Sequence, residues 1–285
     1  MYTIKKYPED FYVKEIINLE LDNNGNNSYF LLKKKDYNTI DAIRKISKIF
    51  KVREKDIGFA GNKDKRAVTE QYISIPKRTN KEIKLRDIEL EFVGYGKERL
   101  NLGDNKGNFF RIVIREAKTE PKAREEFTNY FGEQRFGRNN VEIGRLIVKK
   151  KFDEASELLG PPKGLKGIQQ IPKRILKMYL SGYQSYLWNT VVSRMDKLPD
   201  KVSLVGFDTE LKEEEYVKLM TEEGITPRDF IIRQLPLMSV EGGERKTRQK
   251  ASNLKIQQSD KGFEIEFELP KGSYATVFIN QLFSR

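Results

Sequence analysis

Residues 58–75 read GFAGNKDKRAVTEQYISI. An apolar run at 57–60 leads into a Gly-Asn turn, charged residues follow, and a second apolar run at 68–75 leads away. This pattern predicts two strands joined by a short loop. Asp64 lies in that loop between Lys63 and Lys65, so the stretch is also the first candidate for a chemical site.

Net charge points to the class of partner. The chain has 285 residues, with 54 Lys and Arg against 42 Asp and Glu, and a formal net charge of +12. This length suits one large domain or two of ordinary size, with a core that needs no metal or disulfide. The excess of positive charge favours a polyanion as partner. A solvated Lys-rich surface, as in hyperthermophile proteins, is the alternative. Nucleic acid is favoured because basic residues alternate with aromatic ones in several segments.

The chain contains neither Cys nor His. Disulfide scaffolds, zinc fingers, cysteine nucleophiles and Ser-His-Asp triads are therefore excluded. The acids, bases and nucleophiles that remain are carboxylates, Lys, Tyr, Ser and Thr. The N-terminal residues lack the apolar region of a secretory signal, and no apolar run reaches the ~18 residues that cross a bilayer. We therefore expect a cytoplasmic protein without a membrane segment.

Periodicity predicts an α+β fold. Strands are expected where apolar residues alternate, at 10–17, 29–32, 57–60, 68–75, 88–93, 107–114 and 263–269. The first two should form a hairpin around the Asn-rich loop 22–27. Helices are expected at 39–50, capped by Asn38 or Thr39, and at 121–130, 141–150, 152–159 and 213–223, with a last helix capped by Ser273. A long helix is expected at 173–195, with one apolar stripe formed by Leu176, Leu180, Tyr183, Leu187 and Val191. Because 139–240 is largely helical between strand-rich flanks, we expect it to be an insertion.

Two segments combine basic residues with a loop-like composition. NYFGEQRFGRNN, residues 129–140, mixes aromatic residues with Arg135 and Arg138, which suits base stacking and phosphate contact. GGERKTRQK, residues 242–250, is expected to be flexible, and its Arg245, Lys246 and Arg248 could follow a phosphate backbone. Ordinary packing aromatics and a solvated charged loop are the alternatives, and neither segment alone excludes them.

The residues leave a carboxylate as the candidate for catalysis. No spacing of Asp and Glu singles out a two-metal set, and no phosphate-binding glycine motif is present. A carboxylate such as that of Asp64 can act as nucleophile or base without a metal. Asp also closes turns routinely, and for Asp64 alone that structural role is the favoured interpretation.

Five motifs together resemble the TruD family of pseudouridine synthases. Its signature GxKDxxAxTxQ is matched by Gly61, Lys63, Asp64, Ala67, Thr69 and Gln71. The other matching segments, in the order of the family, are PEDFYVKE at 8–15, NYFGEQRFG at 129–137, YQSYLWN at 183–189 and LPKGSYATV at 269–277. These matches span nearly the whole chain.

The resemblance implies a fold and a reaction. The fold is a pseudouridine synthase core with a mixed, mainly antiparallel sheet, assigned to 1–138 and 241–285, and an inserted TRUD-type domain at 139–240. The insert is shorter than in many relatives, so contacts that a larger insert makes to RNA are not expected. The activity is the conversion of uridine to pseudouridine in RNA, at position 13 of tRNA, with no cofactor and no metal. The target uridine is flipped into a pocket. We expect a monomer.

The resemblance also implies residue roles. Asp64 is the nucleophile and attacks either C1′ of the ribose or C6 of the uracil. Phe11 and Tyr274 match aromatic residues of the pocket, Asn129 matches its amide, and Phe131 replaces a tyrosine of other pseudouridine synthases. Lys5 matches a lysine that pairs with the aspartate, and Lys63 is its local competitor. Two other functions stay open: an RNA-binding module that has lost the reaction, and a metal-dependent RNA hydrolase.

Overall fold

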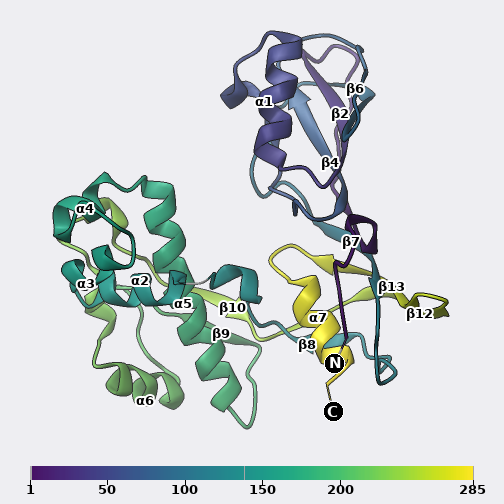
Figure 1. Ribbon diagram of the computed structural model, residues 1–285. Helices are drawn as coiled ribbons and strands as arrows, with labels where there is room; N and C mark the ends of the chain where they lie inside the picture. Colours follow the sequence, from purple (N-terminus) through teal and green to yellow (C-terminus); the bar gives the residue numbers. More distant parts are fainter. Residues whose placement is uncertain (1, 138, 285) are drawn as a thin grey trace. The chain divides into compact units, whose positions relative to one another are not determined.

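The computed structural model describes residues 2–137 and 139–284, which form two compact units (Figure 1). Unit 1 runs from the N-terminus to Phe127 and also holds Lys250–Ala275 and the residues from Ile279 onward. Unit 2 holds Thr128–Gln249 and Thr276–Phe278.

Unit 1 is built on a sheet of nine strands in the order β12-β13-β7-β1-β4-β2-β6-β5, with β3 on β4. Its strands are β1 (Phe11–Ile16), β2 (Asn27–Lys35), β3 (Gly58–Phe59), β4 (Val68–Ile75), β5 (Ile83–Lys84), β6 (Ile88–Gly96), β7 (Gly107–Ile114), β12 (Ser252–Ser259) and β13 (Gly262–Pro270). β1 pairs with β4 in parallel, and the other pairings within this sheet are antiparallel. The predicted fold class, α+β with a mixed and mainly antiparallel sheet, is confirmed.

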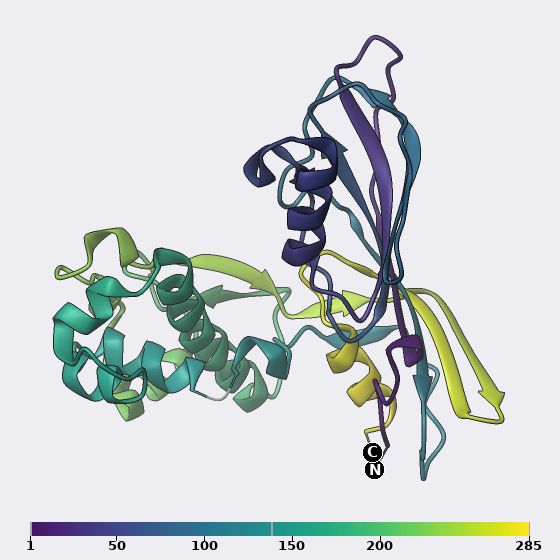
Figure 2. The ribbon, with the colours of Figure 1, turned by 45° about the horizontal axis from the view of Figure 1, so that its top comes forward.

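One helix, α1 (Thr39–Phe50), lies along β2 and β4 in both views (Figures 1 and 2). The Asn38 side chain accepts a hydrogen bond of 2.8 Å from the Ile40 amide and so caps the helix, which decides between the two predicted caps, Asn38 and Thr39. The apolar side of α1 packs against both strands to form the core, whose members include Phe30, Leu32, Ile43, Ile46, Phe50, Ile73 and Ile75. Burial of this helical stripe holds α1 on the sheet.

Strand β1 lies in the middle of the sheet, between β7 and β4. Its side chains alternate as predicted, with Phe11, Val13 and Glu15 all at most 4% exposed. Tyr12 is opposite Val68 in the parallel register. Because β1 and β4 run in the same direction, the segment before β1 and the loop before β4 lie at the same edge of the sheet.

Unit 2 is organised around the long helix α5 (Lys173–Arg194). Its other elements are α2 (Asn140–Val148), α3 (Phe152–Glu157), α4 (Gly164–Gln170), α6 (Glu214–Glu223), β9 (Lys201–Leu204) and β10 (Gly243–Lys246). The predicted α5 stripe is buried at Leu176, Leu180, Tyr183, Leu187 and Val191. A Cβ on Gly144 of α2 would come within 2.3 Å of the Tyr179 carbonyl oxygen, so close packing on α5 requires glycine there. None of the described helices is both long and apolar enough to cross a membrane.

Two predictions fail because long-range pairing decides the structure. The hairpin of 10–17 with 29–32 does not form, since β4 lies between β1 and β2. The helix predicted at 121–130 is replaced by β8 (Glu126–Thr128), which pairs with β11 (Arg248–Lys250). Pairing with β11 satisfies the backbone groups of this short segment, and its Phe127 is buried.

Two local predictions are also wrong. The basic segment 242–250 is not a flexible loop, because β10 pairs with β9 and β11 pairs with β8. The last helix, α7 (Ala275–Leu282), has Tyr274 and not Ser273 at its N-cap. Short 3-10 turns complete the fold at Pro8–Asp10, Glu54–Asp56, Glu133–Arg135, Pro227–Phe230 and Pro236–Met238.

The N-cap of α1 gives a stability test. Asn38→Ala removes the acceptor for the Ile40 amide, so the free energy of unfolding should fall by about 1 kcal/mol. Urea unfolding followed by circular dichroism measures the change. The control is Asn80→Ala, because Asn80 is exposed and lies outside the helices and strands. An equal loss in both variants would contradict the capping role.

Candidate active site

The loop between β3 and β4 presents Asp64 to the segment that precedes β1. The Lys5 ammonium lies 2.5 Å from Oδ2 of Asp64 and donates a hydrogen bond to it. The Lys5 side chain is 23% exposed and that of Asp64 is 36% exposed. The carboxylate is therefore oriented by an ion pair and still open to solvent on one side.

Lys5 is itself held over an aromatic ring. Its ammonium lies 4.0 Å from the centroid of Phe11, within the range of a cation–π interaction. Phe11 contacts Phe110 edge to face at 6.1 Å, and Phe110 stacks on Phe267 at 5.4 Å. Phe11 is only 2% exposed. In this geometry the Phe11 ring contacts the Lys5 ammonium, and the ring face is not open for stacking with a base.

The segment carrying Lys5 is fastened at both sides. Arg115 donates to both carboxylate oxygens of Asp10, at 2.9 and 2.7 Å, and the Tyr7 amide donates to the same carboxylate at 3.0 Å. The hydrogen bonds from Arg115 lower the pKa of Asp10, although burial opposes the shift. The Arg66 guanidinium donates to the Lys6 carbonyl at 2.8 Å and so joins the Asp64 loop to this segment.

Lys63, the other candidate partner of Asp64, points elsewhere. Its ammonium lies 2.7 Å from Oε1 of Glu15 and donates to Oδ1 of Asn108 at 2.7 Å. The second carboxylate oxygen of Glu15 accepts from the Tyr72 amide at 3.0 Å. Glu15 and Lys63 form a buried ion pair beneath the loop, and Lys5 is the lysine that pairs with Asp64.

Sequence reasoning missed Lys34. This residue is 2% exposed, and its ammonium donates to the Asp64 carbonyl at 2.9 Å and to the Lys63 carbonyl at 3.4 Å. Burial lowers the pKa of Lys34 to about 8, and the charge of Asp64 opposes that shift. The strand period could have identified it, since in the run Lys33–Lys35 the middle side chain faces opposite to its neighbours.

Gly61, Ala67 and Gln71 of the signature, together with Thr39, hold the loop backbone. Thr39 Oγ1 donates to Oε1 of Gln71 at 3.1 Å and accepts from the Lys63 amide at 3.1 Å. The Gln71 amide donates to the Gly61 carbonyl at 3.0 Å. The Ala67 carbonyl accepts from the Asp36 amide at 3.0 Å. These bonds fix the peptide groups on both sides of Asp64, which determines the direction of its carboxylate.

A second group of predicted residues gathers in unit 2 around Asn129. Arg245 donates twice to the Asn129 carbonyl, at 3.0 and 2.8 Å, and once to its Oδ1 at 2.9 Å. The Asn129 amide donates to the Lys246 carbonyl at 3.1 Å, and the residue is 3% exposed. Its side chain therefore has partners on both polar atoms and must exchange them before it can bind a base.

Phe131 packs on the YQSYLWN segment of α5, residues 183–189. The Arg245 guanidinium lies 3.9 Å from the Phe131 ring centroid, and Trp188 contacts that ring edge to face at 5.6 Å. Asn189 accepts from the Phe131 amide at 2.9 Å and donates to its carbonyl at 3.0 Å. Asn189 was not predicted, and no periodic signal marks it, since its role is a backbone clamp across 58 residues.

The predicted RNA contacts differ in accessibility. Lys246 and Arg248 are exposed on β10 and β11, whereas Arg245 is half-buried against Asn129. Arg135 is half-buried, and its guanidinium lies 5.9 Å from the Phe131 ring. Arg138 lies outside the described residues. Tyr274 precedes α7 in unit 1 and is half-buried.

Within residues 2–137 and 139–284, no three or more Asp or Glu side chains are grouped closely enough to hold a metal ion. The described geometry thus offers a single carboxylate with a paired lysine at the Asp64 loop.

Comparisons with known proteins place this arrangement in a family. The model of the family described as tRNA pseudouridine synthase D (TruD) matches residues 2–164 and 197–282. The chain belongs to the TruD family. The resemblance inferred from the five motifs is therefore confirmed.

Three similar proteins match most of this TruD chain. A tRNA pseudouridine synthase D of Aquifex aeolicus is 33% identical, and the match covers 98% of this chain and 97% of the relative. A Pyrococcus furiosus protein named "Probable tRNA pseudouridine synthase D" is 37% identical over 71% of this chain and 64% of its own length. The crystal structure of a TruD protein from Methanosarcina mazei has the same fold, with a TM-score of 0.77, 24% identity and coverage of 99% and 93%.

The Aquifex relative is longer than this TruD chain. The alignment between them extends over 375 positions, although this TruD chain has 285 residues. The Aquifex protein therefore carries residues that have no counterpart here. The boundaries of the inserted domain at 139 and 240 remain a prediction.

Burial of Lys34 gives a pH test. Unfolded Lys34 takes up a proton more readily than the folded residue, because burial lowers the folded pKa to about 8. At pH 7 the buried Lys34 therefore lowers the free energy of unfolding. This unfavourable contribution becomes smaller as the pH rises toward the pKa of Lys34 in the unfolded chain. Lys34→Met should reduce the difference in unfolding free energy between pH 7 and pH 10 by roughly 2 kcal/mol, at about 1.36 kcal/mol per pKa unit.

Urea unfolding at the two pH values measures this effect. Lys48→Met is the matched control, because Lys48 is exposed on α1. If Lys34→Met and Lys48→Met respond equally to pH, the desolvation of Lys34 is not the cause.

Proposed function

We propose that this TruD protein converts uridine to pseudouridine in tRNA, with Asp64 as the nucleophile and without a cofactor. The observation that supports this role is the ion pair of 2.5 Å between Lys5 and Asp64, at the signature position of the family. The relatives whose names state an activity are tRNA pseudouridine synthases. The finer assignment of uridine 13 rests on the family resemblance.

The reaction is an isomerisation and needs no atoms beyond the substrate. The bond between N1 of the base and C1′ of the ribose breaks, the base turns, and C5 forms a new bond to C1′. The proton that leaves C5 is balanced by the proton that N1 gains. Asp64 can attack C1′ and displace N1, in which case the bond from C1′ to the carboxylate breaks when C5 attacks C1′. It can instead add to C6, in which case the bond from C6 to the carboxylate breaks by elimination after C5 has joined C1′. Both routes release Asp64 unchanged, and both begin with a carboxylate that is directed and open to solvent.

Lys5 contributes to this step as a positioning residue. Its ammonium fixes one carboxylate oxygen of Asp64 and leaves the other, Oδ1, for the attack. Phe11 acts through Lys5, which lies on its ring. Lys34 acts through the loop, since it binds the Asp64 carbonyl and not the carboxylate. A rigid support of this kind lowers the entropic cost of reaching the reactive geometry.

The target uridine has to leave the RNA stack before Asp64 can reach it. Tyr274 and Phe131 supply aromatic surface for the flipped base or its neighbours, at about 1–3 kcal/mol per stacked base. Asn129 reads the edge of the uracil after its bond with Arg245 is exchanged. Arg245 thus acts on the substrate through Asn129 and Phe131. The exposed Lys246 and Arg248, with Arg135 and Arg138, contact the phosphate backbone.

Asp64→Asn tests the nucleophile. The amide keeps the size of the carboxylate but cannot attack, so pseudouridine formation should fall by at least about 10³-fold, while the Kd for tRNA changes by less than about threefold. Chemical mapping of pseudouridine in total tRNA, treated with each variant, measures the reaction and also identifies the site. Asp260→Asn is the control, because Asp260 is exposed in the turn between β12 and β13.

Each outcome separates the functions. Full activity of Asp64→Asn would falsify the assignment of the nucleophile. A wild-type protein that binds tRNA but forms no pseudouridine is an RNA-binding module with the same fold. A modified position other than 13 changes the target and leaves the mechanism in place.

Chelation gives an independent test. Pseudouridine formation should be unchanged in excess EDTA, and the tRNA should remain full length on a denaturing gel, because a carboxylate nucleophile needs no metal. Loss of activity that added Mg²⁺ restores, in a tRNA whose fold is shown to be intact by native gel, would contradict metal-free chemistry. Cleaved tRNA would indicate the hydrolase instead.

A further inference from the structure

The first half of α5 carries a run of positive charge that no acidic residue balances. The sequence holds no Asp or Glu between Glu157 and Asp196. Lys173, Arg174 and Lys177 are exposed, and we call these three residues the α5 basic stripe. They lie on one side of the helix, since residues three and four apart are neighbours on its surface.

The stripe has no stabilising role in the helix that would explain it. Among the ion pairs of residues 2–137 and 139–284, none involves Lys173, Arg174 or Lys177. Positive side chains near a helix N-terminus are also unfavourable with respect to the helix dipole. The α5 basic stripe is therefore suited to bind an anion from another molecule.

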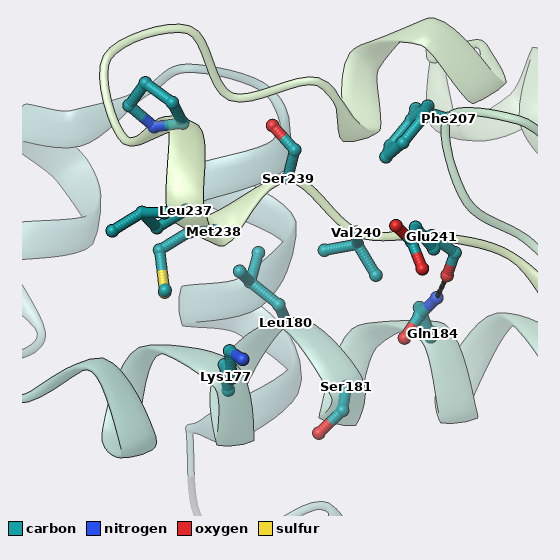
Figure 3. A pocket seen from close by; sticks show the side chains of 11 residues that line it. Lys177, Leu180, Ser181, Gln184, Phe207, Leu237, Met238, Ser239, Val240 and Glu241 are labelled. Carbon is teal, nitrogen blue, oxygen red and sulfur yellow. Dashed lines mark hydrogen bonds between the residues drawn. The ribbon is translucent and has the colours of Figure 1, made fainter.

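A pocket of about 590 Å³ begins at the end of this stripe. Figure 3 shows it between α5, which contributes Lys177, Leu180 and Gln184, and the segment that carries Leu237 and Glu241. Its volume is within the range of about 300–1,000 Å³ for small-molecule pockets. The lining mixes apolar and polar side chains: Lys177, Leu180, Ser181, Gln184, Phe207, Pro236, Leu237, Met238, Ser239, Val240 and Glu241.

The two ends of the pocket differ in chemistry. Lys177 supplies a cation at one end, continuous with the stripe. At the other end, Gln184 donates to the Glu241 carbonyl at 3.1 Å, two helical turns from Lys177, or about 10 Å along the axis. The half-buried ring of Phe207 and the Leu237 side chain, which is 68% exposed, supply apolar surface. The Glu241 carboxylate repels phosphate at its end but can accept an N–H of a base.

We propose that the α5 basic stripe and this pocket bind one unstacked nucleotide of the tRNA substrate and the backbone beside it. The phosphates lie against the stripe, and the base enters the apolar part of the pocket, toward Phe207 and Glu241. A nucleotide matches this arrangement because it carries an anionic end and a flat, polar-edged base at the other. The proposal rests on the proposed function, since it takes tRNA as the partner. It adds a second RNA site, formed entirely within unit 2.

Removing charge from the stripe tests the phosphate contacts. Lys173→Ala/Lys177→Ala should raise the Kd for tRNA roughly tenfold at about 0.15 M salt and raise KM by about the same factor. The slope of log Kd against log salt should become shallower by about 1.4–1.8, because each of the two lost phosphate contacts contributes roughly 0.7–0.9. Lys45→Ala/Lys48→Ala removes two exposed lysines from α1 and controls for net charge.

Removing apolar surface tests the base pocket. Leu237→Ser should raise the Kd for tRNA roughly threefold or more without changing the salt slope, because no charge is lost. Leu102→Ser is the control, since Leu102 is 75% exposed and lies in unit 1. Leu237 and Leu102 are both exposed, so circular dichroism should show the wild-type fold for both variants.

The outcomes separate this site from the reaction. The proposal is overturned if Lys173→Ala/Lys177→Ala binds tRNA with the wild-type Kd and salt slope, or if the α1 control shows the same loss. It is also overturned if Leu237→Ser binds tRNA as well as the wild type does. A wild-type protein that binds tRNA through this site but forms no pseudouridine overturns the proposed function alone.

Discussion

The parallel pairing of β1 with β4 is the constraint on which the Asp64 site depends. The register that places Tyr12 opposite Val68 brings the segment before β1 next to the loop before β4. Lys5 reaches Asp64 only because these two segments lie at the same edge of the sheet. Fifty-nine positions of sequence separate the two residues, so no local interaction could have formed this pair. The antiparallel neighbours β7 and β2 then hold the parallel pair on both sides.

Beneath the loop, buried charge is arranged so that each group has a partner. Desolvating an ion is costly, and a buried pair compensates for that cost only with good geometry and further hydrogen bonds. Glu15 and Lys63 lie 2.7 Å apart and gain further hydrogen bonds from the Tyr72 amide and the Asn108 side chain. Lys34 bonds to main-chain carbonyls instead, and burial lowers its pKa although the charge of Asp64 opposes that shift. Such groups add little net stability but fix one loop conformation.

Unit 2 uses α5 for two purposes. Its buried stripe and Trp188 form the core of the unit, and Asn189 holds the segment that carries Phe131. Its exposed side carries the α5 basic stripe. The same helix thus supports the Asn129 group from inside and offers a charged surface outside. Arg245 connects Asn129 with α5, since it binds Asn129 and lies over the rings of Phe131 and Trp188.

The sequence by itself determined the elements whose side-chain period is strong. The α1 helix with its Asn38 cap, strand β4, strand β13 and the stripe of α5 all lie where the pattern predicts, because local periodicity and capping decide them. The spaced motifs also indicated the family and singled out Asp64. Tertiary structure alone decided which lysine pairs with Asp64, and it buried Lys34 beneath the loop. It also made 126–128 a strand and turned Arg245 inward to Asn129. These outcomes depend on which strands pair and in what register, and pairing between distant segments leaves no periodic signal in either of them.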